Sequence, residues 1–289
     1  MNGILLIDKE PGWTSNDVVV KLKGVLHERR IGHSGTLDPM ATGLLVVFVG
    51  RATRAVPFAE HDSKRYLASL RLGVTTDTQD TTGNILQTRS VDMDEERLRE
   101  ILPRFLGEQT QIPPMYSAIR VNGRRLYDIA RKGGEVERAP RPITIHELTL
   151  LGREGEDYLL NVRCSKGTYI RTLCHDIGEA AGCGGCMSAL RRTEAGAFSV
   201  SDAVTIGEAQ RLSDEGRIAD RLLPVDSLFA AYPACCADAS DERKIRCGTE
   251  YPTDLPDGEY RVYNGAGSFL MLGKAEGGTM KTIKNFFEV

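Results

Sequence analysis

The segment Ile31–Leu45, which reads IGHSGTLDPMATGLL, constrains the fold of this chain more than any other stretch. Three glycines within 12 positions permit a tight backbone that other groups can approach closely. Asp38 precedes a proline, which biases it toward an extended conformation and ends any local helix. The apolar run Leu44–Val49 that follows has the length of a fully buried strand. We therefore expect a carboxylate on a stiff loop at the edge of a hydrophobic core.

Strand and helix patterns mix along the chain without a regular βαβ repeat, which favours an α+β fold over a doubly wound sheet. Alternating or apolar runs predict strands over residues 4–8, 44–50, 65–74, 142–151 and 157–164. Apolar faces and capping signals predict helices over residues 14–26, 92–105, 126–134, 168–180 and 205–212. In the second of these helices, Asp92 and Glu95 resemble a capping box.

A change of composition near Leu223–Pro233 marks the expected domain boundary. Residues 201–259 carry 13 acidic against 6 basic side chains, and turn signals then punctuate a short β-type tail. We expect a large domain over residues 1–231 and a small β-rich domain over residues 232–289.

The 37 Lys and Arg against 40 Asp and Glu give a net charge of -3, which excludes a uniformly basic nucleic-acid binder. A locally basic region remains at residues 116–146, where seven basic and three acidic side chains leave +4. The basic residues are Arg120, Arg124, Arg125, Arg131, Lys132, Arg138 and Arg141. On charge alone, this segment is either a solvated surface arm or an arm that contacts phosphates.

Several classes of protein are disfavoured by what the sequence lacks. No apolar run approaches the ~18 residues of a membrane span, and the N-terminus carries no export or transit pattern, so we expect a cytoplasmic protein. P-loop, Rossmann and His-Glu-x-x-His motifs are missing. Cys183 and Cys186 form a single CxxC, which is weak evidence for zinc. Neither a metal nor a cofactor is expected.

Taken alone, Asp38 is either a functional carboxylate on a rigid loop or the cap of a turn. Its context resembles the active-site motif of the TruB family of pseudouridine synthases, in which this aspartate is the catalytic nucleophile. Further stretches resemble the other motifs of that family, in the same order and over about residues 3–198. They are Asp8–Ser15, Lys64–Tyr66 with Leu72–Gly83, Gln111–Ala118 with Asn122–Arg131, Cys164–Arg171 and Leu190–Thr193.

The resemblance implies a pseudouridine synthase fold, with a mixed, mainly antiparallel central sheet and an active-site cleft, followed by a small PUA-like RNA-binding domain. Residues 111–146 would form a basic RNA-binding insertion of the bacterial type. The implied reaction is the isomerisation of uridine 55 in the T-loop of tRNA to pseudouridine, without a cofactor. The uridine would be flipped out of the folded T-arm stem-loop. A monomer is expected, with no guide RNA.

The resemblance also assigns roles to three residues. Asp38 is the nucleophile, and Arg171 pairs with it and favours its charged form. Tyr66 stacks on the target base and takes part in proton transfer from C5. The route stays open between a glycal, addition to the sugar and Michaelis-type addition to the base.

Other matched positions concern substrate binding. His33 corresponds to the residue that fills the space left by the flipped nucleotide, and Tyr169 and Leu190 correspond to substrate-pocket residues. Core packing explains Leu190 equally well, and the strand alternation explains Tyr66. The expected phosphate contacts are Lys64, Arg131, Arg141 and Lys166.

Three rival functions remain at this point. One is a guide-RNA-dependent relative, which the insertion near residues 111–134 and the absence of a polybasic tail disfavour. A second is a non-catalytic RNA-folding protein, and this is compatible with catalysis because TruB proteins are also regarded as tRNA chaperones. The third is a glycosidase, which needs a second carboxylate, such as Asp77 or Asp80.

Overall fold

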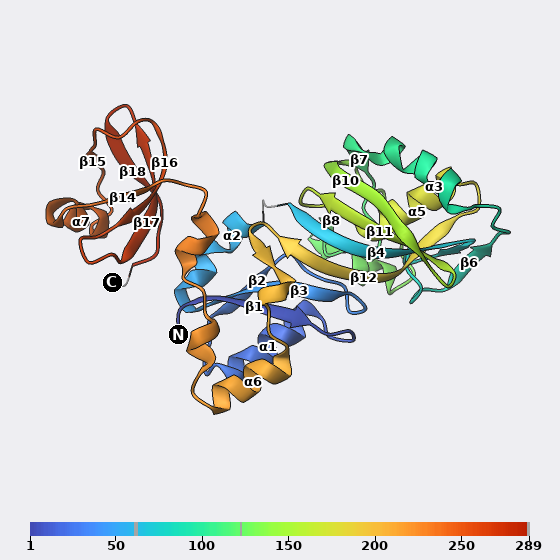
Figure 1. Ribbon diagram of the computed structural model, residues 1–289, viewed down its shortest axis with the longest axis horizontal. Helices are drawn as coiled ribbons and strands as arrows, with labels where there is room; N and C mark the ends of the chain where they lie inside the picture. The colour runs from blue at the N-terminus through green and yellow to red at the C-terminus, as the bar shows by residue number, and fades with distance from the viewer. Residues whose placement is uncertain (61–62, 122, 288–289) are drawn as a thin grey trace.

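The computed structural model of this protein describes residues 1–60, 63–121 and 123–287; Asn122, part of one motif, lies outside them. Figure 1 shows an elongated molecule with a large sheet and, at one end, a separate small sheet. The large sheet has the order β1 (Gly3–Lys9), β3 (Thr42–Val49), β12 (Gly185–Ala195), β4 (Lys64–Leu72), β11 (Asp157–Cys164), β10 (Arg141–Glu154) and β7 (Gly107–Gln111). Among its described pairs, β3 and β12 alone run parallel. The predicted α+β fold with a mixed, mainly antiparallel sheet is confirmed.

Two short strands also belong to this sheet: β2 (Ile31–Ser34) pairs with β3, and β13 (Phe198–Ser199) pairs with β12. The other short strands are β5 (Val74–Thr76), β6 (Ile85–Thr88), β8 (Arg120–Val121) and β9 (Arg124–Arg125). The α-helices are α1 (Ser15–Val25), α2 (Val56–Ala59), α3 (Glu95–Ile101), α4 (Leu126–Ala130), α5 (Ile170–Ala180), α6 (Ile206–Asp214) and α7 (Ala239–Arg246). The 3₁₀ helices are η1 (Gly50–Ala55), η2 (Leu102–Phe105), η3 (Val200–Asp202), η4 (Ile218–Arg221) and η5 (Val225–Phe229). In the described part of the chain, no helix is long and apolar enough to cross a membrane.

The N-terminal half of the sheet, β1 to β3, is buried on both faces. Residues such as Ile7 pack under α1 and α6, whereas Ile4 and its neighbours pack toward η5 and the small sheet. Helix α1 starts as predicted at Thr14, whose side chain accepts a hydrogen bond from the Asp17 amide while the Asp17 carboxylate accepts one from the Thr14 amide. The apolar run of β3 is therefore a central, two-sided strand.

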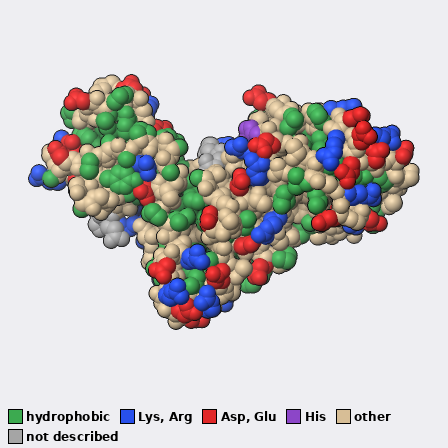
Figure 2. Space-filling view, viewed as in Figure 1, with side chains coloured by type: hydrophobic (Ala, Val, Ile, Leu, Met, Phe, Trp, Pro, Cys, Tyr) green, Lys and Arg blue, Asp and Glu red, His purple; other side chains and the backbone are tan. Residues whose placement is uncertain are grey.

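The other half of the sheet buries one face and exposes the opposite face to solvent. In β4, the predicted alternation holds, with Tyr66, Ala68, Leu70 and Leu72 buried toward α3 and α5. The opposite face of β4 carries ion pairs, including Arg65 to Glu147 at 2.6 Å and Arg71 to Asp157 at 2.7 Å. Figure 2 likewise shows charges of both signs interspersed over the side in view.

Strand β12 joins the two halves, and the sequence pattern does not predict it. Its pairing with β4 is shifted twice, between Met187 and Ala189 and between Arg192 and Glu194, so a simple period of two is lost. It also buries an arginine, Arg192, at an inward position. Both features hide a central strand from pattern analysis.

Two predicted helix starts are wrong by two residues. Helix α3 is capped by Asp94, whose carboxylate accepts from the Arg97 amide at 2.8 Å, and not by Asp92, which pairs with the Arg97 side chain. Helix α5 starts after Tyr169, because the Thr168 hydroxyl donates to the Ser165 carbonyl in the preceding turn.

The C-terminal sheet has the order β14 (Ala234–Cys236), β16 (Gly258–Tyr263), β17 (Phe269–Glu276), β18 (Thr279–Asn285) and β15 (Tyr251–Pro252). Phe269 and Phe286 stack with ring centroids 5.4 Å apart, and both reach Phe229 of η5. The Arg54 side chain donates to the Asn285 side chain at 2.8 Å. The small sheet therefore packs against the N-terminal half through a shared aromatic cluster.

We predict that Gly43→Ala destabilises the protein strongly. Gly43 has φ +95°, and a Cβ there would lie 2.2 Å from the backbone oxygen of Arg192 in β12. We expect a loss of about 3 kcal/mol or more from backbone strain and overpacking together. Urea unfolding checks this, with Gly155→Ala as the control because Gly155 has φ +59° but open space around its Cβ position. Equal losses in the two variants would show that β3 and β12 are not in tight contact.

Candidate active site

The loop between β2 and β3 holds Asp38 in place through contacts with the chain around residues 9–15. The Leu37 amide donates to the Ser15 hydroxyl at 2.9 Å, and that hydroxyl donates back to the Leu37 carbonyl. The Gly12 amide donates to the Pro39 carbonyl at 2.8 Å. The residues on either side of Asp38 are thus fixed, as the proline and glycines of this loop predicted.

Lys9 adds a buried cation beneath this loop. Its ammonium donates to the carbonyls of Glu10, Trp13 and Pro39 at 2.8–3.2 Å. Burial lowers the pKa of Lys9 to about 8, although the charge of Asp38 opposes this change. Sequence reasoning did not assign Lys9 a role in the site; its place on the inward face of β1 was the available signal.

Arg171, in the first turn of α5, pairs with Asp38 as the resemblance implied. Its Nε lies 2.9 Å from Asp38 Oδ2, and its Nη2 donates to Asp38 Oδ1 at 3.2 Å. The guanidinium also donates to the carbonyls of Thr78 at 3.0 Å and Tyr116 at 2.8 Å. A two-pronged contact of this kind fixes both the charge and the orientation of the carboxylate.

Asp80 belongs to the same network of ion pairs and hydrogen bonds, in which it contacts Arg171. It is buried, and its Oδ2 lies 3.7 Å from Arg171 Nε. Its other oxygen accepts from the Thr78 hydroxyl at 2.8 Å and from the Thr82 amide at 3.0 Å. We assign Asp80 a positioning role for Arg171, which the sequence had suggested only as a second carboxylate of a glycosidase.

Two opposing effects set the charge state of Asp38. Burial raises the pKa of Asp38, and the neighbouring carboxylate of Asp80 raises it further, whereas the cations Arg171 and Lys9 lower it. The net direction is upward. Arg171 thus limits the effect of burial rather than bringing the pKa below its ordinary value.

Tyr66 and Leu190 line the same part of the core. They lie on the adjacent strands β4 and β12 and share a buried cluster with Leu37 and Ala41, which flank Asp38. Burial raises the pKa of Tyr66, so its hydroxyl is protonated at neutral pH. A neutral phenol of this kind is a weak base.

His33 and Tyr169 come from different elements, β2 and the residue before α5. His33 belongs to β2 and pairs with Val47; burial lowers the pKa of His33, which favours a neutral imidazole. The Tyr169 amide donates to the Gln111 side chain at 2.8 Å, and Gln111 donates back to the Tyr169 carbonyl at 3.1 Å. This reciprocal pair ties the start of α5, and hence Arg171, to the end of β7.

The four expected phosphate contacts occupy different environments. Arg131, Arg141 and Lys166 are exposed. Lys64 is only 7% exposed and donates to the Glu60 carbonyl at 2.9 Å, so it would have to leave that carbonyl to reach a phosphate.

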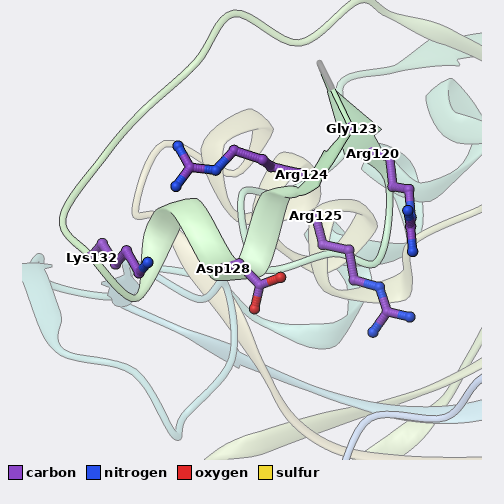
Figure 3. A pocket seen from close by; sticks show the side chains of 6 residues that line it. All are labelled: Arg120, Gly123, Arg124, Arg125, Asp128 and Lys132. Atoms are coloured by element: carbon purple, nitrogen blue, oxygen red, sulfur yellow. The ribbon is translucent and has the colours of Figure 1, made fainter.

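The basic insertion forms a small β8–β9 hairpin followed by α4. Its side chains surround a hollow of about 440 Å³, shown in Figure 3. The lining residues are Arg120, Gly123, Arg124, Arg125, Asp128 and Lys132. Arg125 and Arg131 also lie over the Tyr127 ring, at 5.6 and 5.4 Å from its centre. Four cations against one carboxylate make this hollow attractive to a polyanion.

The described residues contain no cluster of three or more His, Cys, Asp or Glu side chains that could hold a metal. Cys183 and Cys186 are buried free thiols, and Cys186 belongs to β12. Burial raises the pKa of Cys186 to about 11, which disfavours the thiolate that zinc requires.

The arrangement as a whole presents one carboxylate, Asp38, held by the Arg171 guanidinium beside an aromatic ring and apolar side chains. Asp80 is engaged with Arg171, Thr78 and Thr82, and Asp77 closes a turn by accepting two hydrogen bonds from Asn84. Both candidate second carboxylates thus hold the polypeptide together, which disfavours the glycosidase alternative.

Comparisons with known proteins identify the family of this chain. A family model described as TruB family pseudouridylate synthase (N terminal domain) matches residues 23–170, and one described as tRNA pseudouridylate synthase B C-terminal domain matches residues 171–230. A protein of Dechloromonas aromatica (strain RCB) named tRNA pseudouridine synthase B is 45% identical over 266 residues, 91% of this chain and 88% of its own. One of the same name from Clostridium kluyveri is 40% identical and covers 99% of this chain and 100% of its own.

Solved structures share the fold. A chain from a Cbf5-Nop10-Gar1 complex superposes with a TM-score of 0.75 at 26% identity, covering 99% of this chain and 85% of that one. A chain from an H/ACA RNP bound to a substrate RNA containing 2'-deoxyuridine gives the same TM-score at 24% identity, with the same coverage. Fold and site together define a pseudouridylate synthase. Within that class, the chain belongs to the TruB family.

We predict that Asp38 titrates above the ordinary aspartate value, and that its neighbours move it in opposite directions. Arg171→Gln removes an opposing cation, so the pKa of Asp38 should rise further. Asp80→Asn removes a like charge, so the pKa should fall. Carbon-13 NMR of labelled carboxyl groups measures both, with Arg191→Gln as a control because Arg191 pairs with Asp8 instead. Titration of Asp38 below its ordinary value in the unaltered protein would contradict the assignment.

Proposed function

We propose that this protein isomerises uridine 55 in the T-loop of tRNA to pseudouridine, with Asp38 as the nucleophile and no cofactor. The observation that carries the proposal is the paired contact of Arg171 with both oxygens of Asp38, beside Tyr66 and Leu190. The relatives that are 40–48% identical and bear the name tRNA pseudouridine synthase B support tRNA as the substrate.

The chemistry requires one glycosidic bond to break and one carbon–carbon bond to form. The C1′–N1 bond of the uridine breaks, the uracil turns within the site, and C5 then bonds to C1′. N1 gains a proton and C5 loses one, so the reaction is redox-neutral. The ionised Asp38 carboxylate assists by adding to the sugar or the base, or by a glycal route. Tyr66 stacks on the turning base.

Access to the base requires that the T-loop open. Flipping the uridine costs a few kcal/mol of stacking, which contacts in the pocket must offset. We assign Tyr169, Leu190 and His33 to that pocket. Exposed Arg131, Arg141 and Lys166, together with the arginines around the insertion's hollow, suit the phosphates of the T-arm.

We further propose that the protein acts on tRNA as a monomer without a guide RNA. The solved structures with the same fold come from a complex with two further proteins and from an H/ACA RNP, but at 24–26% identity they share less with this chain than the tRNA-named relatives do. In this proposal, residues 1–231 form the catalytic domain and residues 232–289 a PUA-like RNA-binding domain.

We predict that Asp38→Asn abolishes isomerisation while the T-arm stem-loop still binds. The amide keeps the shape of the carboxylate but removes the nucleophilic charge. Carbodiimide labelling with primer extension maps pseudouridine in the stem-loop, and filter binding gives Kd. Asp157→Asn is the matched control, because Asp157 is a carboxylate in a surface ion pair with Arg71. Equal losses of binding and rate would count against the nucleophile. Binding without conversion by the unaltered protein, on both stem-loop and full tRNA, would favour the RNA-folding function.

We predict that Arg131→Ala and Arg141→Ala each weaken stem-loop binding and flatten its salt dependence. Each phosphate contact contributes about 0.7–0.9 to the slope of log K against log salt, and each substitution removes one cation. Binding titrations between low and moderate salt measure the slope. Arg211→Ala is the control, since Arg211 lies on α6 and pairs with Glu215. A slope equal to that of the control would remove the residue from the phosphate contacts.

A further inference from the structure

The candidate site is formed by both halves of the large sheet. The halves meet where β3 pairs with β12, and we call this contact the joint. Asp38 precedes β3, whereas Tyr66 and Leu190 lie on β4 and β12. The backbones of the two halves pair in parallel at two positions, Arg191 with Thr42 and Arg192 with Gly43. A contact that holds β3 against β12 at this joint therefore also fixes the position of Asp38 relative to Tyr66 and Leu190.

The Arg192 side chain fills this joint. It is 1% exposed and is among the largest fully buried side chains. Its Nε donates to the Leu44 carbonyl at 2.7 Å, and its Nη2 donates to the Gly35 carbonyl at 2.8 Å. These two carbonyls lie just before and just after the Asp38 loop, so one guanidinium holds both ends of that loop.

The loop lies close against both the guanidinium and the backbone of Arg192. A Cβ at Gly35 would lie 3.0 Å from Arg192 Nη1, and one at Gly43 would lie 2.2 Å from the Arg192 carbonyl oxygen. Both glycines have positive φ, +69° and +95°. The loop backbone is thus shaped around the arginine, which explains the two glycines on either side of Asp38.

Arg192 also reaches the stacking residue. It lies opposite Tyr66 in the β4–β12 register, and its charge and hydrogen bond lower the pKa that burial raises at the Tyr66 hydroxyl. Within the described parts of the chain, no ion pair involves Arg192; its hydrogen bonds to backbone use carbonyls. Burying a cation is costly unless its donors are satisfied, and here the loop itself supplies the acceptors.

We propose that Arg192 is a positioning residue that sets the Asp38 loop against Tyr66. It touches no reacting atom and acts through the loop that it holds. The proposal rests on the proposed isomerisation for its kinetic consequence, but its structural consequence is independent of any reaction.

The test compares Arg192→Lys and Arg192→Met with Arg191→Met. Lysine keeps the charge, but a single ammonium lacks the fork that serves two separated carbonyls. Arg191 is the matched control, because it is the next residue of β12, lies partly exposed on the other face, and pairs with Asp8. Single-turnover conversion and Kd of the T-arm stem-loop are measured, together with amide hydrogen exchange of residues 35–44 in the free protein.

We expect Arg192→Lys to slow conversion about 100-fold, since a displacement of about 1 Å in a reacting group has that effect. Kd should change by no more than about twofold, which is less than 1 kcal/mol. Exchange over residues 35–44 should be faster than in the unaltered protein and in Arg191→Met. Arg192→Met should show the same changes more strongly, and if it does not fold, Arg192→Lys decides.

The proposal is overturned if exchange over residues 35–44 is unchanged in Arg192→Lys, or if the rate falls no more than in Arg191→Met. It is also overturned if Kd rises in step with the loss of rate, because that indicates a role in binding. If the unaltered protein leaves the stem-loop unconverted, the proposed function fails on that result alone, and hydrogen exchange still decides the role of Arg192.

Discussion

The pairing of Asp38 with Arg171 is the interaction on which the site depends. The Arg171 side chain is buried, the Asp38 side chain is partly buried, and burial is the largest cause of the raised pKa of Asp38. Charges removed from water persist only where partners replace the lost hydration. Arg171 is such a partner for Asp38, and Asp80, Thr78 O and Tyr116 O in turn hold Arg171. Removal of one member therefore affects the others.

The site lies where the two halves of the large sheet meet, and each half has its own hydrophobic core. The β1–β3 half presents Asp38, and the half from β12 to β7 presents the aromatic and apolar surface. Lys9 and Arg192 are buried cations that bind backbone carbonyls around the Asp38 loop from either side. Of the three cations, Arg171 and Lys9 act on the charge of Asp38 itself, since both oppose the upward pKa shift that burial causes.

Some elements of the fold were predicted from the sequence, and others were not. The apolar run of β3, the alternation of β4 and a capped helix at α1 were predicted, because each is a local signal of burial or hydrogen bonding. Strand β12 was not, because two register shifts and a buried arginine break its alternation. Asp38, Tyr66 and Arg171 were identified by resemblance of their motifs, and residue type alone left a turn cap for Asp38 and a core aromatic for Tyr66 as alternatives.

The sequence by itself determined the α+β class, the stiff loop that carries Asp38, the basic insertion and the family. These follow from local backbone preference, periodicity and motif order, which need no long-range contact. Only the tertiary structure decided that Asp80 lies behind Arg171, that Lys9 is bound by three carbonyls, and that Arg192 holds both ends of the loop. The physical reason is that these side chains are ordinary charged residues in the sequence. Their burial, and hence their effect on the site, arises when strands distant along the chain pair.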